Sequence, residues 1–212
     1  MKENTDKNAA TALPGNVAGL EALISRANKQ GKGLPPVHLW EPEFCGDLDM
    51  EIKRDGTWFY MGTPIGRQPL VRLFSTVLRK DEDGKTYLVT PVEKIGIRVE
   101  DAHFVAVEVN QSHGDGEPVL TFRTNVGDVV EAGPDTPLRF EIVKENDGLK
   151  PYLNVRGRLE ALIARPVMYE LISYGEEMEI DGKTMFGVRS NGSIFPIMPA
   201  DELAELSQMS SQ

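Results

Sequence analysis

The spacing of apolar residues along this chain switches between the period of a strand and that of a helix. Over residues 48–52, apolar and acidic side chains alternate, which is the period of a half-buried strand. Asp55-Gly56, a dipeptide typical of hairpin turns, follows, and residues 58–61 resume the apolar run. After Pro69 the apolar residues recur at helical spacing, which predicts a helix with one buried face. The pattern thus predicts a hairpin, a helix and, after the turn at Asp83-Gly84, a second pair of strands.

The same order of signals returns in the second half of the chain. Asp-Gly turns are common, so chance is the alternative explanation, but the shared order of hairpin, proline-started helix and hairpin favours an internal duplication. We therefore expect an α+β fold with two copies of a β-hairpin–helix–β-hairpin unit, an N-terminal helix and a short C-terminal helix. The matching pairs are Glu51-Ile52 with Glu141-Ile142, Asp55-Gly56 with Asp147-Gly148, Pro69 with Pro166, and Asp83-Gly84 with Asp181-Gly182.

The duplication suggests how the chain is organised. Residues 1–15 are polar and lack the apolar content to offset the entropy of ordering, so we expect a disordered tail. An N-terminal α+β half over 16–100 would hold the first copy, and a β-rich connection over 101–138 would follow. A C-terminal α+β half over 139–206 would hold the second copy, and 207–212 would form a frayed end.

Charge and cysteine content narrow the classes of function. The formal net charge of −10 repels phosphate backbones, so nucleic acid is not an expected partner. Cys45 is the single cysteine, which excludes an internal disulfide and fits a reducing compartment. No run of residues is apolar over the length of a signal peptide core or a membrane span, so we expect a cytoplasmic protein without a membrane partner.

The first half also carries a long run of motifs that resembles a family of small bacterial proteins catalogued as a domain of unknown function. The resemblance implies a two-part α+β fold with repeated motifs and a link to signal transduction, without an established activity. His103 stands where the family pattern has proline, which puts an essential role for this histidine in doubt. The motifs are Cys45-Gly46 with Asp49, Asp55-Gly56-Thr57-Trp58 with Tyr60, Gly62-Thr63-Pro64-Ile65 with Arg67, and 88–94 with the sequence LVTPVEK.

Candidate catalytic residues are few. Asp47, Asp49 and Glu51 share one face of the predicted strand, where they form either a cation site or, as we favour, a solvated acidic surface. No histidine lies near a nucleophile motif, and neither a metal site nor a cofactor site is expected. We therefore expect a binding or regulatory protein without catalysis. The alternative is a small hydrolase that uses Asp47 and Asp49, or His103.

A candidate binding site emerges from the comparison of the two copies. The second copy does not retain the charges of Arg72 and Glu93, so the scaffold does not require them; ordinary surface charge is the alternative explanation. Together with Arg67, they would lie in a groove at the junction of the two units. Trp58 and Tyr60 would form an apolar wall of this groove. Guanidinium groups favour carboxylate or phosphate, so we expect a small anionic ligand or a protein partner with an acidic segment.

Overall fold

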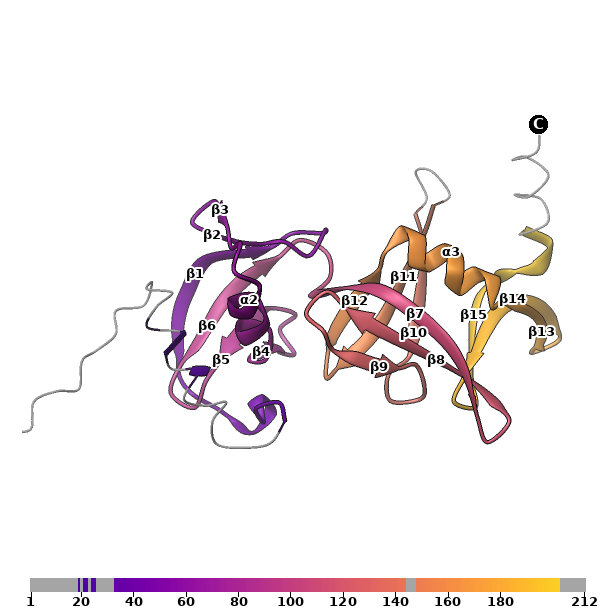
Figure 1. Ribbon diagram of the computed structural model, residues 1–212, viewed down its shortest axis with the longest axis horizontal. Helices are drawn as coiled ribbons and strands as arrows, with labels where there is room; N and C mark the ends of the chain where they lie inside the picture. The colour runs from indigo at the N-terminus through magenta and orange to yellow at the C-terminus, as the bar shows by residue number, and fades with distance from the viewer. Residues whose placement is uncertain (1–18, 20, 23, 26–32, 144–147, 203–212) are drawn as a thin grey trace, which may run out of the picture.

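The computed structural model describes residues 19, 21–22, 24–25, 33–143 and 148–202. The chain forms two halves that lie side by side, each built around a curled sheet of six strands (Figure 1). A further sheet of three strands lies at the C-terminal end of the second half. The architecture is therefore mostly β.

The first half contains one six-stranded sheet in the order β3-β2-β1-β6-β5-β4. Its central strands, β1 and β6, pair in parallel, whereas all other neighbours in the sheet are antiparallel. The chain therefore leaves the sheet at one edge and returns to it at the other. The elements are the 3-10 helix η1 (Val37–Leu39), β1 (Phe44–Ile52), β2 (Trp58–Tyr60), β3 (Thr63–Pro64), α2 (Gln68–Ser75), β4 (Leu78–Lys80), β5 (Thr86–Val89) and β6 (Lys94–Val99).

Helix α2 connects the two edges of this sheet and covers one of its faces (Figure 1). Its apolar side chains Leu70, Val71 and Phe74 are buried, and the ring of Phe74 stacks on Trp58 with 6.2 Å between centroids. Pro69 lies in the first turn, where its missing N–H costs no hydrogen bond. The helix predicted from Pro69 is therefore present, with the predicted buried face.

The second half contains a six-stranded sheet in the order β10-β11-β12-β7-β8-β9, again with one parallel pair, β7 with β12. Strands β13, β14 and β15 form a separate antiparallel sheet. Helix α3 connects β12 to this smaller sheet. The elements are β7 (Phe104–Gly114), β8 (Glu117–Thr124), β9 (Val129–Glu131), β10 (Leu138–Val143), β11 (Gly148–Arg156), β12 (Leu159–Ile163), α3 (Arg165–Ser173), β13 (Glu176–Ile180), β14 (Lys183–Ser190) and β15 (Ser193–Pro199).

The prediction of an α+β fold is wrong, because the structure is β-rich: strands make up 52% of the described residues. Helices α2 and α3 span only 8 and 9 residues, while β7 alone spans 11. The two expected copies also differ in their pairing. Strand β6 returns beside β1, whereas β13, β14 and β15 form a sheet of their own. Local patterns predicted the order of hairpin and helix correctly, but the sheet to which each strand belongs depends on distant partners.

The predicted ends of the chain lie largely outside the described residues. This applies to the expected tail over 1–15, to the frayed end over 207–212 and to most of both terminal helices. Of the N-terminal helix, the described residues between 19 and 25 are helical, and Ile24 is fully buried in the core. Of the C-terminal helix, residues 200–202 are helical. In the described part of the chain, no helix has the length and apolar character needed to cross a membrane.

Candidate binding site at the junction of the two halves

Arg156, at the end of β11, connects the second half to the first. Its Nη2 donates to the carbonyl oxygen of Ser75 at 2.8 Å, and its Nη1 forms an ion pair with Asp128. The guanidinium lies 4.9 Å from the centroid of the Phe104 ring. Because Ser75 is the last residue of α2, the cation lies at the negative end of the helix dipole. This arrangement fixes the turn between β11 and β12 against the first half.

Asp101, in the segment between the two halves, forms a second connection. Its carboxylate accepts hydrogen bonds from Lys150 at 2.9 Å and from the Tyr152 hydroxyl at 2.7 Å, and it pairs with Arg54 at 3.2 Å. Burial alone would raise the pKa of Asp101, but the bonds from Lys150 and Tyr152 outweigh it and lower the pKa. Asp101 is therefore an ionised anchor between the β1–β2 turn and β11.

His103, two residues further on, is 3% exposed and contacts both halves. Its Nε2 lies 3.0 Å from the hydroxyl of Thr86 on β5, and its Nδ1 accepts a hydrogen bond from the backbone N–H of Glu160 at 3.3 Å. Burial lowers the pKa of His103 to about 4, with a further contribution from the charge of Lys80. The imidazole is therefore neutral near pH 7.

These contacts determine the tautomer of His103. Since Nδ1 accepts from a backbone N–H, the proton of the neutral ring is on Nε2, which donates to the Thr86 oxygen. A general base needs a free lone pair directed at the proton it removes. His103 has none available toward Thr86, so this geometry argues against the hydrolase alternative that uses His103.

A cavity of about 950 Å³ lies at the junction, and we call it the junction cavity. One side is formed by residues 34–38 and by β4, and the other by the turn between β11 and β12. Apolar side chains from both halves supply much of its surface, among them Val37, Leu78 and Leu159. Its size is typical of a site for a small molecule.

Charged groups surround this apolar surface. Arg79 is held by Asp81 at 2.6 Å and by the carbonyl oxygens of Val37 and Trp40, so it stabilises the rim. Arg158 pairs with Glu82 at 2.9 Å across the junction, but their side chains are 55% and 88% exposed. Exposed pairs of this kind contribute little and exchange readily. Lys80 forms no ion pair within the described residues, so its ammonium is available to a ligand.

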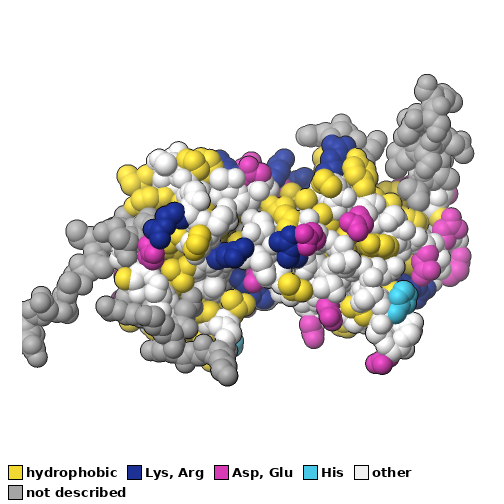
Figure 2. Space-filling model, in the orientation of Figure 1, with side chains coloured by type: hydrophobic (Ala, Val, Ile, Leu, Met, Phe, Trp, Pro, Cys, Tyr) yellow, Lys and Arg dark blue, Asp and Glu magenta, His cyan; other side chains and the backbone are white. Residues whose placement is uncertain are grey.

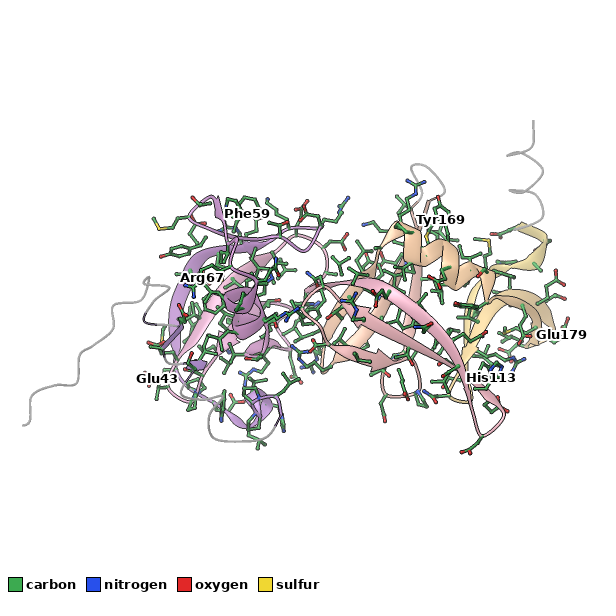
Figure 3. All side chains as sticks on the ribbon, viewed as in Figure 1. Glu43, Phe59, Arg67, His113, Tyr169 and Glu179 are labelled. Carbon is green, nitrogen blue, oxygen red and sulfur yellow. The ribbon has the colours of Figure 1, made fainter. Side chains whose placement is uncertain are left out.

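The surface around the junction has mixed charge. Figure 2 shows several Lys and Arg side chains near the middle of the molecule, where the two halves meet. Acidic side chains gather instead at the far end of the second half, over β13, where Glu179 lies (Figures 2 and 3). On the face that Figure 2 shows, basic side chains are therefore more frequent near the junction than over β13.

The structure does not bring the five predicted site residues together. Trp58 is 1% exposed and belongs to the core under α2, so it cannot form a wall of an open site. Tyr60, at the end of β2, is half-buried and packs against the core. Glu93 lies in the loop before β6, beside the start of β1, while Trp58 pairs with Ile52 at its far end.

The two predicted arginines also lie apart. Arg67 precedes α2, has a 72% exposed side chain and lies 3.7 Å from Glu21 (Figure 3). Arg72 lies in the last turn of α2, and its guanidinium is near Gly127 of the second half. Only Arg72 therefore faces the junction, and it does not line the junction cavity.

The acidic face predicted on β1 is present, but counter-charges occupy it. Asp49 pairs with Arg98 at 2.7 Å, and Glu51 pairs with Lys53 at 3.1 Å. Among the residues that the structure describes, no group of three His, Cys, Asp or Glu side chains is placed to hold a metal ion. This face therefore has the character of an ion-paired surface.

The residues that line the junction cavity were mostly missed at the sequence level. Lys80 and Leu159 belong to ordinary strand patterns, and nothing in their neighbourhood distinguishes them. Arg156-Gly157-Arg158 did carry a signal, because the second copy has extra residues at this point relative to the first. Two arginines in a segment that the repeat does not require were a sign of a role at the junction.

The fold and the junction define a β-rich protein with two sheet-bearing halves and a cavity between them. The chain belongs to the DUF1285 family. The model of its N-terminal domain, a domain of unknown function, matches residues 35–102, and that of its C-terminal domain, from a protein of unknown function, matches residues 103–197. The family membership predicted from the motifs of the first half is thereby confirmed.

Two crystal structures of DUF1285 family proteins are similar to this chain. The protein from Silicibacter pomeroyi DSS-3 is 47% identical, with a TM-score of 0.79 over 90% of this chain and 98% of that one. The protein from Shewanella baltica OS155 is 23% identical, with a TM-score of 0.48 over 59% of this chain and 91% of that one. No curated protein matches the chain.

Proposed function

We propose that this protein is a non-catalytic, cytoplasmic regulator that binds a small organic anion in the junction cavity. The observation that carries the proposal is the cavity itself, about 950 Å³ in volume, with walls from both halves of the chain. Apolar surface with a few polar groups is the usual composition of small-molecule sites. A ligand with an apolar body and one acidic group fits this composition.

The charges of the cavity support a single acidic group. Lys80 has no ion-pair partner among the described residues, and Arg158 is held only by the exposed Glu82. A ligand carboxylate would bind Arg158 through paired hydrogen bonds and displace Glu82. Asp81 and Asp83 lie on the same rim and would repel a highly charged polyanion. The cavity therefore suits a monoanion better than nucleic acid.

The position of the cavity supports a regulatory role, which we propose to be in signal transduction. A ligand in contact with both halves stabilises the docked arrangement in which both walls are present. Binding would then be coupled to the contacts of Arg156 and Asp101 across the junction. The single cysteine, which suits a reducing compartment, supports the cytoplasmic location.

The test is a thermal-shift screen followed by calorimetry of the hits. The probes are benzoate, indole-3-acetate and AMP, with benzamide as an uncharged match for benzoate. A ligand that binds only the folded state stabilises it by about 2.7 kcal/mol at a hundred times its dissociation constant, which a melting shift reports. We expect an aromatic monocarboxylate to stabilise the protein and the uncharged match to have no effect.

Two variants locate the binding of a hit. Arg158→Glu reverses the charge at the rim, and Leu34→Trp fills part of the cavity from its exposed edge. Both should weaken the hit at least tenfold. Arg123→Glu is the matched control, because Arg123 is also an exposed arginine paired with an acid, but on β8. Equal affinity of the hit for the parent and for all three variants would contradict the proposal. A hit that binds only when a protein partner is present would contradict it as well.

A further inference from the structure

A second cavity, of about 390 Å³, lies at the end of the β4–β5 hairpin; we call it the Thr86 cavity. It is a separate feature from the site proposed above, although Lys80 lines both cavities. Its surface is more polar than that of the junction cavity and includes two deeply buried polar side chains. The residues that line it are Asp47, Leu48, Lys80, Gly84, Lys85, Thr86, Gly96, Ile97, Arg98, Val99, Asp101 and His103.

The sheet is locally open beside this cavity. In the parallel pairing of β1 with β6, Asp47 is opposite Gly96 and Glu51 is opposite Arg98, so β1 uses more residues than β6 over the same stretch. A Cβ at position 96 would clash with the Asp47 carboxylate, so glycine leaves room for that carboxylate. The irregular pairing and Gly96 thus let the Asp47 side chain pack closely against β6.

A directed chain of hydrogen bonds ends in the Thr86 cavity. The Glu160 N–H donates to His103 Nδ1, and His103 Nε2–H donates to the Thr86 oxygen. The Thr86 hydroxyl proton then has no acceptor within the described residues, although this side chain is 6% exposed. A buried donor without an acceptor costs free energy, so this proton calls for an acceptor in the cavity.

Two lysines line the cavity together with Thr86. Lys80 is directly opposite Thr86 in the β4–β5 ladder, which places their side chains on the same face of the sheet, and Lys85, at the end of the hairpin, also lines the cavity. Neither ammonium forms an ion pair in the part of the chain that the structure describes. The acceptor at this place is therefore expected to be negatively charged.

The acids of the same cavity do not supply that acceptor. Asp101 already accepts from Lys150 and Tyr152 and pairs with Arg54. The Asp47 carboxylate lies over Gly96, which is opposite Tyr87, so it is on the face of the sheet away from the Thr86 side chain. The space between Lys80, Lys85 and Thr86 thus lacks an oxygen acceptor.

We propose that Thr86, Lys80 and Lys85 bind an oxyanion, the carboxylate or phosphate group of a small molecule, in the Thr86 cavity. The Thr86 hydroxyl donates one hydrogen bond to it, and the two ammonium groups supply the charge. His103 is a positioning residue, because it holds the hydroxyl with its proton directed away from the ring. Binding would then depend on the contact between the two halves, since His103 and Thr86 belong to different halves.

The first measurement is the tautomer of His103, by two-dimensional NMR of the imidazole nitrogens. A proton on Nε2 is the expected result. A proton on Nδ1 would mean that Thr86 donates to the ring and has nothing left for a ligand, which would overturn the proposal.

The second measurement is an NMR titration of the whole protein with inorganic phosphate and, separately, with acetate. We expect amide shifts at 84–86 with millimolar affinity, and the stronger of the two probes identifies the oxyanion. Thr86→Val, which removes the donor, and Lys85→Ala should each weaken binding at least fivefold, while Thr86→Ser should retain it. Arg158→Glu, which alters only the junction cavity, should leave it unchanged.

Several outcomes would refute the proposal. These are no shifts at 84–86 with either probe, or Thr86→Val binding as tightly as the parent. If Thr86→Val fails to fold, Lys85→Ala and Thr86→Ser decide the matter. The Lys85 side chain forms no hydrogen bond or ion pair with the described residues, and serine keeps the hydroxyl. Binding in the junction cavity is tested with Arg158→Glu, and binding in the Thr86 cavity with Lys85→Ala. A negative result for one cavity therefore does not contradict the proposal for the other.

Discussion

The guanidinium of Arg156 donates to the carbonyl oxygen of Ser75 at 2.8 Å, and these two residues belong to different halves of the chain. The carbonyl is one of the unpaired acceptors that every helix leaves at its C-terminal end. The second half thus supplies a donor for the last carbonyl of α2, and the same guanidinium neutralises Asp128 within the second half.

We expect Arg156→Met to lower the free energy of unfolding by about 2 kcal/mol, because it removes hydrogen bonds to a charged group and leaves Asp128 unpaired. Chemical denaturation measures this change. The control is Arg123→Met, which breaks the exposed pair with Glu108 and should cost less than about 1 kcal/mol. Equal losses in both variants would show that the contact with Ser75 contributes nothing.

The second prediction concerns pH. Burial lowers the pKa of His103 from the usual 6.5 to about 4, so the folded protein keeps this ring neutral while the unfolded chain takes up a proton. The unfolded state therefore binds more protons between these values, and the free energy of unfolding falls as the pH falls from 6.5 to 4. The full effect is about 3 kcal/mol.

Stability curves of the parent and of His103→Gln over this pH range test the prediction. Glutamine supplies a donor and an acceptor without a titrating group, so the variant should lose most of the slope. His113→Gln, at the exposed end of β7 (Figure 3), should keep it. An unchanged slope in His103→Gln would assign the pH dependence to other groups.

The third prediction contrasts two glycines within strands. A Cβ at Gly187 would lie 2.6 Å from the backbone oxygen of Phe195 on the paired strand, so an alanine there forces β14 and β15 apart. A Cβ at Gly96 would clash with the side chain of Asp47, which can rotate away, and would meet Phe44 only at an ordinary contact distance. We expect Gly187→Ala to cost more than about 2 kcal/mol and Gly96→Ala less than about 1 kcal/mol.

Thermal and chemical unfolding of both variants provide the measurement. The double variant Asp47→Ala with Gly96→Ala should recover part of whatever Gly96→Ala loses, because the conflicting carboxylate is gone. Equal costs at the two glycines would show that close approach of the backbone at Gly187 does not determine stability.

Much of the local structure follows from the sequence. The alternation over 48–52 predicted the buried side of β1 correctly. Pro69 indicated the start of α2, because a helix tolerates proline in its first turn and at few other positions. Asp181-Gly182 forms a tight turn with both residues at positive φ, as its composition predicts. These features depend on neighbours in the chain, which is why a single sequence reveals them.

The sheet pairing and the candidate sites were not predictable in the same way. The expected site contained Trp58 because aromatic residues often line pockets, but the same ring fits the core under Phe74 equally well. His103, Thr86 and Glu160 come together only when β5, β7 and β12 are in place. Contacts between strands that are distant in sequence leave no local pattern, so local chemistry grouped five residues that the structure places apart.

The parallel pairs also have a consequence for how the chain folds. Phe44 pairs with Lys94, and Phe104 with Ala161, so the parallel pair of each half joins strands that are roughly 50 residues apart in the chain. Closing such a loop early in folding costs conformational entropy. During synthesis, β1 has no partner on that side until β6 has emerged from the ribosome. A chain stopped before residue 94 would leave the edge of β1 exposed to other chains. Slow folding and a need for protection of this edge are thus built into the topology.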